Sequence, residues 1–434
     1  MSPIFVGTIG IVCMFLLMIL RTPVAFAMLI VGFFGLWMLN GIWAAGAVLL
    51  TESYAAVSAY SLIVIPMFVL LGNVASAAGF SRGLYEAAFA WIGRFRGGLA
   101  SASVIGCAAF SAVCGSSVAT AVTIGKVALP EMRRRGYADG LSTGAIAAGG
   151  TLGFLIPPST AFVIYAILTE ESIGRLFMAG ILPGLLMTAL FIAAVLVVVS
   201  LNPAAGPRGE AVPFGRRIAV LGQAMPLVAV IVLSIGGIYI GAFTPVEASG
   251  IGAALVILLA VARRAISLAA FRQAVFDTVK TSAMLYMIVI GANVLNPFLA
   301  VTHIPTALGE GLATLGLGPY GSLAVIILTY IVLGMFLDGL AMLVVTIPIV
   351  FPVIVQNGFD PIWFGVVVVI VIEMSMITPP VGLNVFVVKG VAEDVPLTTI
   401  FRGILPFLLA MLTGLLLIIL FPDIALLIPN TMFN

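Results

Sequence analysis

Charged side chains are scarce in this sequence: they make up 8% of its residues, against roughly 25% in soluble domains. The chain has one histidine and three cysteines. The cysteines lie in apolar surroundings without metal-ligand spacing, so neither a zinc site nor a disulfide framework is indicated. It also lacks the Gly-x-x-x-x-Gly-Lys-Ser/Thr loop, which excludes ATP hydrolysis by this chain. We therefore expect no enzymatic activity, no organic cofactor and no nucleic-acid partner.

Hydrophobic residues, in contrast, fill 63% of the chain. Residues 4–20, 176–201 and 401–421 form apolar runs, each long enough to cross a hydrocarbon core of about 30 Å as a helix. The runs do not alternate apolar and polar residues, which argues against a membrane barrel. No basic residue precedes the first run and no small-residue cleavage site follows it, so we expect no cleaved signal peptide. The composition predicts an all-α polytopic protein of the lipid bilayer.

We predict ten spanning helices, near residues 4–20, 24–39, 60–78, 139–168, 174–200, 218–240, 245–262, 281–300, 361–389 and 401–421. Two other apolar segments, 99–128 and 320–356, are split by small polar tips. Each half of these segments is short for a full crossing, so we interpret both as re-entrant hairpins. Segments 81–97 and 263–280 carry spaced arginines and lysines, which favours amphipathic helices on the membrane surface.

The basic residues test this topology. Threading the chain through ten crossings places every lysine and arginine except Arg175 on one side. Positive residues mark the cytoplasmic side of a membrane protein. Both termini are therefore predicted to be extracytoplasmic.

Several short motifs occur twice in the same order. Thr22-Pro23-Val24 returns as Thr244-Pro245-Val246, and Pro157-Pro158 returns as Pro379-Pro380. An odd number of predicted crossings separates the copies, so the second copy is inverted. We divide the chain into a first inverted repeat, 1–220, with hairpin 99–128 and broken helix 139–168, and a second, 221–434, with hairpin 320–356 and broken helix 361–389. Such inverted repeats are typical of transporters.

The two proline pairs stand in the middle of spanning segments. Adjacent prolines remove two backbone donors and break the helix, and unwound backbone at this depth must line protein or a cavity. Freed carbonyls with the hydroxyls of Ser375 and Thr378 suit a small hard cation. The helix that starts after each pair offers N–H groups to an anion. A kink that only shapes packing is the alternative, which two breaks in register make less favoured.

The hairpin tips carry small polar residues, and close packing of membrane helices is the alternative explanation for small residues there. Three acids are candidates for membrane depth: Glu247, Asp338 and Glu373. Asp338 either helps to hold a cation or caps the second arm of its hairpin. Glu373 either acts at the site or pairs with a distant lysine or arginine. These alternatives stay open at the level of the sequence.

Two pairs of motifs stand at the tips and breaks. One is Cys-Gly-Ser-Ser-Val-Ala-Thr (114–120) with Gly-Thr-Leu-Gly-Phe-Leu-Ile-Pro-Pro-Ser (150–159), and the other is Asp338-Gly339 with Thr-Pro-Pro-Val-Gly-Leu-Asn (378–384). Together they closely resemble the large membrane subunit of TRAP (tripartite ATP-independent periplasmic) transporters. The resemblance spans essentially the whole chain, and it implies a location in the cytoplasmic (inner) membrane of a bacterium or archaeon. It implies sodium-driven import of an organic acid that a periplasmic substrate-binding protein delivers. It also implies an elevator mechanism, in which the hairpins and broken helices form a transport domain. The other helices and a small membrane subunit, here a separate chain, form the scaffold.

The resemblance further implies a sodium ion (Na+) between each hairpin and its neighbouring broken helix. Carried onto this sequence, the first sodium site comprises Ser111, Cys114, Gly153, Ile156 and Pro158. The second comprises Gly334, Ser375, Thr378 and Val381. Cys114 stands where we expect a hydroxyl residue. No lysine or arginine lies beside the breaks to bind a small carboxylate substrate. The candidate residues for binding it are Ser116, Ser117, Ser159, Asp338 and Asn384.

Other functions fit these residues less well. A sodium–dicarboxylate symporter of related inverted-repeat architecture, working without a binding protein, is the alternative. An intramembrane aspartyl protease needs two facing aspartates, and Asp338 with Glu373 is a poor match. A channel needs an open pore, whereas paired hairpins and broken helices suit an occluded site.

Overall fold

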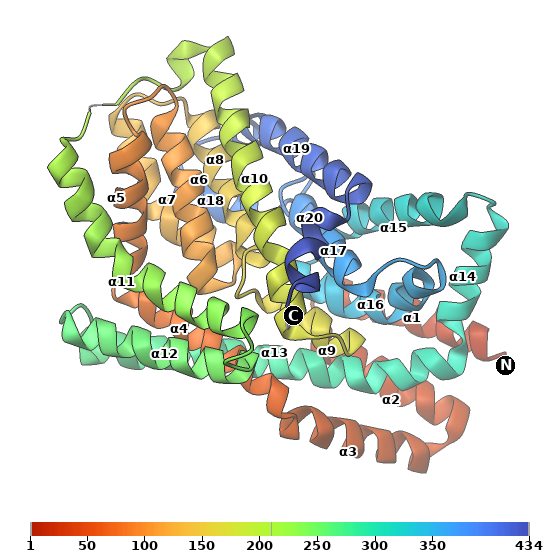
Figure 1. Cartoon of the computed structure of the whole chain (residues 1–434). Helices are drawn as coiled ribbons and strands as arrows, with labels where there is room; N and C mark the ends of the chain where they lie inside the picture. The colour runs from red at the N-terminus through yellow and green to blue at the C-terminus, as the bar shows by residue number, and fades with distance from the viewer. Residues whose placement is uncertain (1, 210, 433–434) are drawn as a thin grey trace.

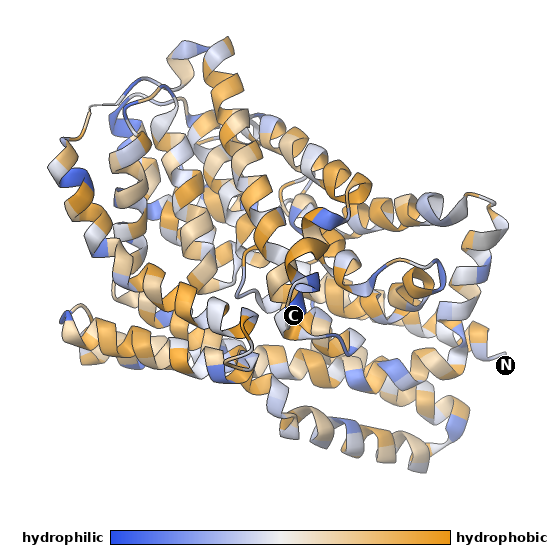
Figure 2. Ribbon diagram, in the orientation of Figure 1, coloured by the Kyte–Doolittle hydropathy of each residue, from blue (hydrophilic) through white to orange (hydrophobic). Residues whose placement is uncertain are grey.

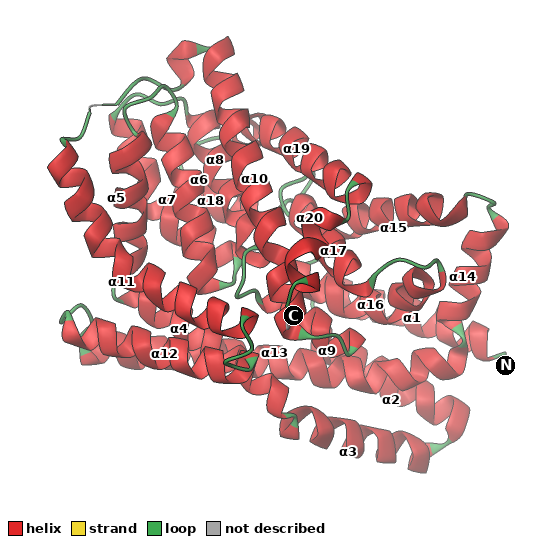
Figure 3. Ribbon diagram, in the orientation of Figure 1, coloured by secondary structure: helices red, strands yellow, loops and turns green. Residues whose placement is uncertain are grey.

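The computed structural model describes residues 2–209 and 211–432, and its regular elements there are helices (Figure 3). The first half of the chain forms α1 (Pro3–Ile19), α2 (Val24–Asn40), α3 (Ile42–Ser58), α4 (Val64–Ala77), α5 (Phe80–Ile92), α6 (Gly98–Cys114), α7 (Ser117–Arg134), α8 (Asp139–Leu155), α9 (Thr160–Thr169) and α10 (Ile173–Leu201). The second half forms α11 (Phe214–Tyr239), α12 (Pro245–Ala262), α13 (Leu268–Thr302), α14 (Ile304–Thr314), α15 (Gly318–Gly334), α16 (Gly339–Gln356), α17 (Pro361–Ser375), α18 (Leu383–Val391), α19 (Leu397–Leu420) and α20 (Asp423–Asn430). Two short 3-10 helices, Tyr60–Ile63 and Pro203–Ala205, complete the set.

The duplicated motifs mark corresponding helices. Each Thr-Pro-Val motif begins a helix, α2 in one half and α12 in the other. The hairpin α6–α7 corresponds to α15–α16, and the broken helix α8–α9 corresponds to α17–α18. The two predicted hairpins and the two predicted broken helices are present in the expected order, and the fold is an all-α polytopic membrane fold.

Eight helical stretches are long and apolar enough to cross a membrane in the described part of the chain. Figure 2 shows hydrophobic residues along most helices and hydrophilic ones gathered near loops. Helices α1 and α2 are shorter, at 17 residues each. The ten-crossing topology stays a prediction.

Two segments differ from expectation. Residues 263–280 do not form a separate surface helix: after a turn, α13 runs unbroken for 35 residues from Leu268 to Thr302. No glycine or proline interrupts 268–290, so nothing stops the helix where the surface helix was expected to end. Helix α3, for which we predicted no element, packs against α2 and α13.

The helices pack in two groups. In the first group α13 contacts α2 and α4, and α4 contacts α12; these helices lie along the lower part of Figure 1. In the other group α8 is central, because it contacts α6, α7, α10, α17 and α19. Every residue of α8 from Leu141 to Leu155 is buried. The polar residues at the end of α8 are thereby held inside protein, where unwound backbone is tolerated.

Candidate ion and substrate site

The tip of the first hairpin is bonded to the first helix break. Gly115 ends α6 with a left-handed φ of 61°, a conformation that glycine adopts without strain. Its carbonyl accepts hydrogen bonds from the Thr160 hydroxyl at 2.8 Å and the Thr160 N–H at 3.4 Å. A Cβ on Gly115 would lie 2.5 Å from the Pro158 carbonyl oxygen. The hairpin tip and the broken helix are therefore one packed unit.

The residues proposed for the first sodium site lie at this contact. A Cβ on Gly153 would lie 2.5 Å from the carbonyl carbon of Ser116, so the glycine lets α8 approach the tip. Ile156 and Pro158 belong to the unwound segment between α8 and α9. Cys114 is the last residue of α6, and Ser111 lies one turn earlier with its carbonyl bonded to the Gly115 N–H. The structure brings together the tip and the break as the prediction requires.

The second hairpin approaches the second break in the same way. A Cβ on Gly334 would lie 2.5 Å from the Ser375 Cβ. The Ser375 hydroxyl donates to the Ile372 carbonyl at 2.5 Å, and the Thr378 hydroxyl donates to the Met374 carbonyl at 2.7 Å. Gly334, Ser375 and Thr378 thus meet at one end of α17, as the second predicted site requires.

The two breaks differ in how they are covered. Pro157, Pro158 and Ser159 are buried in the first break, whereas Pro379, Pro380 and Val381 are exposed in the second. Val381 is 37% exposed and lies on the open side of its break. The two halves of the duplicated sequence therefore have unlike environments in this conformation.

A buried hydrogen bond joins the two halves. The hydroxyl of Ser117, the first residue of α7, donates to a carboxylate oxygen of Glu373 in α17. The Glu373 side chain is 1% exposed, and its other oxygen has no hydrogen-bond partner within the described residues. The alternative pairing of Glu373 with a lysine or arginine is absent from the ion pairs of that part of the chain. Glu373 therefore belongs with the hairpin tip.

Three of the five substrate candidates act as helix N-caps. Ser116 accepts from the Ala119 N–H at 3.5 Å, Ser159 from the Phe162 N–H at 3.2 Å, and Asp338 from the Ala341 N–H at 3.4 Å. Ser159 also donates to the Phe154 carbonyl. Capping satisfies the orphan N–H groups of a helix start. For Asp338 the structure therefore shows the capping role, and the side chains of Ser116 and Ser159 are already engaged.

Asn384 differs from those caps. Its side chain is fully buried, and neither its amide oxygen nor its amide nitrogen has a partner in the described chain. The hydroxyls of Ser111 and Thr120 are likewise buried and unpartnered there. Buried polar groups are almost always hydrogen-bonded, so these side chains have capacity for a ligand. Neither Thr120 nor Glu373 was assigned to an ion or substrate site from the sequence, which had left a role of Glu373 at the site open.

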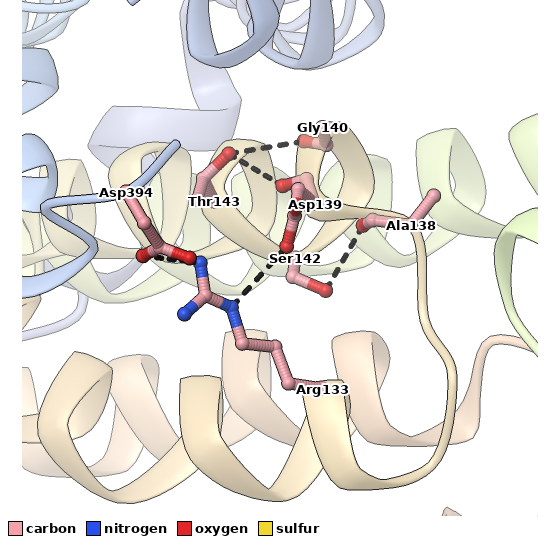
Figure 4. A network of polar contacts seen from close by, with 7 residues as sticks. All are labelled: Arg133, Ala138, Asp139, Gly140, Ser142, Thr143 and Asp394. Atoms are coloured by element: carbon pink, nitrogen blue, oxygen red, sulfur yellow. Dashed lines mark hydrogen bonds and ion pairs between the residues drawn. The ribbon is translucent and has the colours of Figure 1, made fainter. Parts of the chain in front are cut away.

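An ion-pair network links the same elements at the far end of the hairpin (Figure 4). Arg133 in α7 contacts Asp139 of α8 at 3.3 Å and Asp394, after α18, at 2.8 Å. The segment after α18, in the second half, is thus tied to α7 and α8 of the first half. Glu247, the third acid weighed for membrane depth, is instead exposed and forms a capping box with Thr244 at the start of α12.

Comparison with known proteins identifies relatives over the whole length. A family model described as the DctM component of tripartite ATP-independent periplasmic transporters matches residues 11–424. The C4-dicarboxylate TRAP transporter large permease protein DctM of Pseudomonas aeruginosa is 35% identical over 372 residues, which is 86% of each chain. The isethionate TRAP transporter permease protein DctMQ of Oleidesulfovibrio alaskensis is 32% identical over 84% of this chain and 57% of its own length.

A solved structure shares the fold. The crystal structure of the YdaH transporter of Alcanivorax borkumensis aligns with a TM-score of 0.61, covering 90% of this chain and 88% of that one. The sequence identity is 14%, so this likeness concerns the arrangement of helices alone.

Proposed function

Because the chain belongs to the DctM component family of tripartite ATP-independent periplasmic (TRAP) transporters, we propose that it is the large membrane subunit of a sodium-coupled importer of an organic acid. The observation that carries this proposal is the contact of each hairpin tip with its helix break, at Gly115 with Pro158 and at Gly334 with Ser375. Backbone carbonyls freed by the breaks and hydroxyls beside them are the oxygen ligands that hard cations prefer.

The first sodium ion binds where Ser111, Cys114, Gly153, Ile156 and Pro158 meet. The unpartnered Ser111 hydroxyl supports this assignment. The second ion binds at Gly334, Ser375, Thr378 and Val381, where the Ser375 and Thr378 hydroxyls lie on the last turn of α17 and just beyond it. Each ion is coordinated by carbonyl oxygens that the proline pair leaves without N–H partners.

The substrate is a small carboxylate held between the two breaks. The helices α7, α9, α16 and α18 all begin at the tips or breaks, and helix starts carry N–H groups and a partial positive charge suited to an anion. The unpartnered amide of Asn384 adds a donor. The names of the two relatives state different substrates, a C4-dicarboxylate and isethionate, and both compounds are small organic anions.

Import follows an elevator movement. The hairpins α6–α7 and α15–α16 and the broken helices α8–α9 and α17–α18 form the transport domain, and the remaining helices, among them α2, α4, α12 and α13, form the scaffold. A separate small membrane subunit completes the scaffold, and a periplasmic binding protein delivers the substrate. The isethionate relative, with 57% of its length covered, has room for a further segment that this chain does not match.

Energetics favour coupling to more than one ion. A membrane potential of about 100 mV supplies about 2.3 kcal/mol for each positive charge moved inward. Two sodium ions per monoanion move one net positive charge, so both the potential and the sodium gradient drive accumulation.

Reconstituted vesicles test the proposal. Uptake of a labelled C4-dicarboxylate should require the small subunit, a loaded binding protein and an inward sodium gradient. Equal uptake in potassium or choline salts would refute sodium coupling. Equal uptake without the binding protein would instead support a symporter that works alone.

A further inference from the structure

A cavity of about 700 Å³ lies away from the tips and breaks, beside the loop between α5 and α6. Three arginines line it: Arg94 and Arg96 from that loop, and Arg208 from the loop after α10. Ser101 and Ser200 also line the cavity. All three arginines lie on the side that the distribution of basic residues predicts to be cytoplasmic.

The backbone holds these two loops together. The Gly97 N–H donates to the Gly206 carbonyl at 3.0 Å, and the Gly209 N–H donates to the Gly93 carbonyl at 3.2 Å. The Tyr137 hydroxyl donates to the Pro207 carbonyl at 2.9 Å. The arginines therefore come from segments whose relative position the fold fixes.

The charges in this cavity lack a protein counterion within residues 2–209 and 211–432. No carboxylate there pairs with Arg94, Arg96 or Arg208, and no acidic residue lines the cavity. The neighbouring basic run behaves differently, because Arg134 and Arg135 both pair with Glu131. Guanidinium groups bind phosphate through paired N–H donors, so the cavity suits an anion of that kind.

The rest of the lining is largely apolar. Ile105 of α6 and Ile192, Leu196 and Val199 of α10 line the same cavity. Leu196 is 48% exposed, so the apolar wall continues onto the outer surface of α10. Free phosphate has no apolar part to place on such a surface, whereas a lipid covers it with acyl chains.

We propose that this cavity is a binding site for one anionic phospholipid of the cytoplasmic leaflet. Its phosphate sits among Arg94, Arg96 and Arg208, and its acyl chains lie along Ile105, Ile192 and Leu196. Basic pockets between membrane helices on this side take anionic headgroups. Because α6 is the first arm of a hairpin, the lipid fixes the base of that hairpin against α10. The proposal does not depend on sodium coupling or on the transported substrate.

Lipid-dependent unfolding of the purified chain in neutral detergent tests the site. Phosphatidylglycerol should raise the midpoint of thermal unfolding, while phosphatidylcholine and inorganic phosphate at equal concentration should not. The triple variant Arg94→Gln, Arg96→Gln, Arg208→Gln should need at least tenfold more phosphatidylglycerol for half of the shift. The control variant Arg264→Gln, Arg272→Gln, Arg402→Gln removes the same charge at exposed positions outside the cavity and should respond as the unaltered protein does.

If the triple variant fails to fold, two further measurements test the site. Each single arginine variant should weaken the phosphatidylglycerol shift, and Ile192→Trp should weaken it while leaving the charges in place. Equal shifts in the two triple variants would overturn the proposal. So would stabilisation by inorganic phosphate equal to that by the lipid, which would indicate a free-anion site, or equal stabilisation by phosphatidylcholine.

Discussion

Ser117 and Glu373 lie in different halves of the duplicated chain, yet the Ser117 hydroxyl donates a hydrogen bond to the Glu373 carboxylate inside the protein. Ser117 begins the second arm of the first hairpin, and Glu373 lies in the helix before the second break. The bond therefore connects the hairpin of one repeat to the broken helix of the other.

Ser117→Ala should lower the free energy of unfolding by about 1–3 kcal/mol, because it leaves a buried carboxylate without its donor. Chemical unfolding in detergent measures the change. Ser58→Ala is the control, since the Ser58 hydroxyl makes an exposed bond to the Tyr54 carbonyl at 2.8 Å. A neutral amide at position 373 depends less on the Ser117 donor. The double variant Ser117→Ala, Glu373→Gln should therefore lose less free energy of unfolding than the two single variants lose together. Strict additivity would contradict the contact.

Gly115→Ala should reduce sodium-dependent uptake at least tenfold. Its new Cβ would meet the Pro158 carbonyl oxygen at 2.5 Å and push the hairpin tip away from the break. Gly136→Ala is matched, because Gly136 also has a left-handed φ, 75°, but no atom within 4 Å of an added Cβ. That control bears only the backbone strain of about 1–2 kcal/mol. Similar uptake by both variants would argue against a required contact between tip and break.

Thr378→Val should raise the sodium concentration for half-maximal uptake about tenfold, which corresponds to about 1.4 kcal/mol of binding energy. The change keeps the shape of the side chain and removes the oxygen proposed as a ligand. Thr413→Val is the control, because the Thr413 hydroxyl makes the same bond to a preceding carbonyl, at 2.8 Å, on the exposed side of α19. An unchanged sodium dependence in Thr378→Val would remove this hydroxyl from the second site.

Arg133→Gln should destabilise the protein at neutral pH and not at low pH. The hydrogen bond from Arg133 lowers the pKa of Asp394 below its usual value of 3.8. A carboxylate with a lowered pKa stabilises the fold above its unfolded-state pKa, and this contribution is lost as the pH falls through the folded-state pKa. The difference in unfolding midpoint between Arg133→Gln and the unaltered protein should therefore be full at pH 7 and shrink below about pH 4.

Arg82→Gln is the control for that experiment. Arg82 pairs with Glu86 one turn along α5, and both side chains are exposed, whereas Arg133 joins α8 and the segment after α18 to α7. Exposed ion pairs within one helix contribute little to the free energy of unfolding. The Arg82 variant should change the midpoint less at pH 7, and an equal effect of the two variants would show that the cross-link between halves is unimportant.

Much of this fold is readable from local sequence. Adjacent prolines break a helix wherever they stand, so Pro157-Pro158 and Pro379-Pro380 place both breaks without any tertiary information. The small tip residues Gly115 and Ser116 place the first hairpin turn equally well. The prediction of a separate surface helix at 263–280 was wrong, because charge spacing predicts the face of a helix but not the point where it ends.

The sequence by itself determined most of the helices and the residues at the tips and breaks, because these depend on apolar length and on proline and glycine geometry. Only the tertiary structure decided what those residues do. It left Asn384 buried without a partner among the described residues, and it covered the first break while exposing the second. These outcomes depend on contacts between residues far apart in the chain, such as Ser117 and Glu373, and no local pattern encodes such a contact.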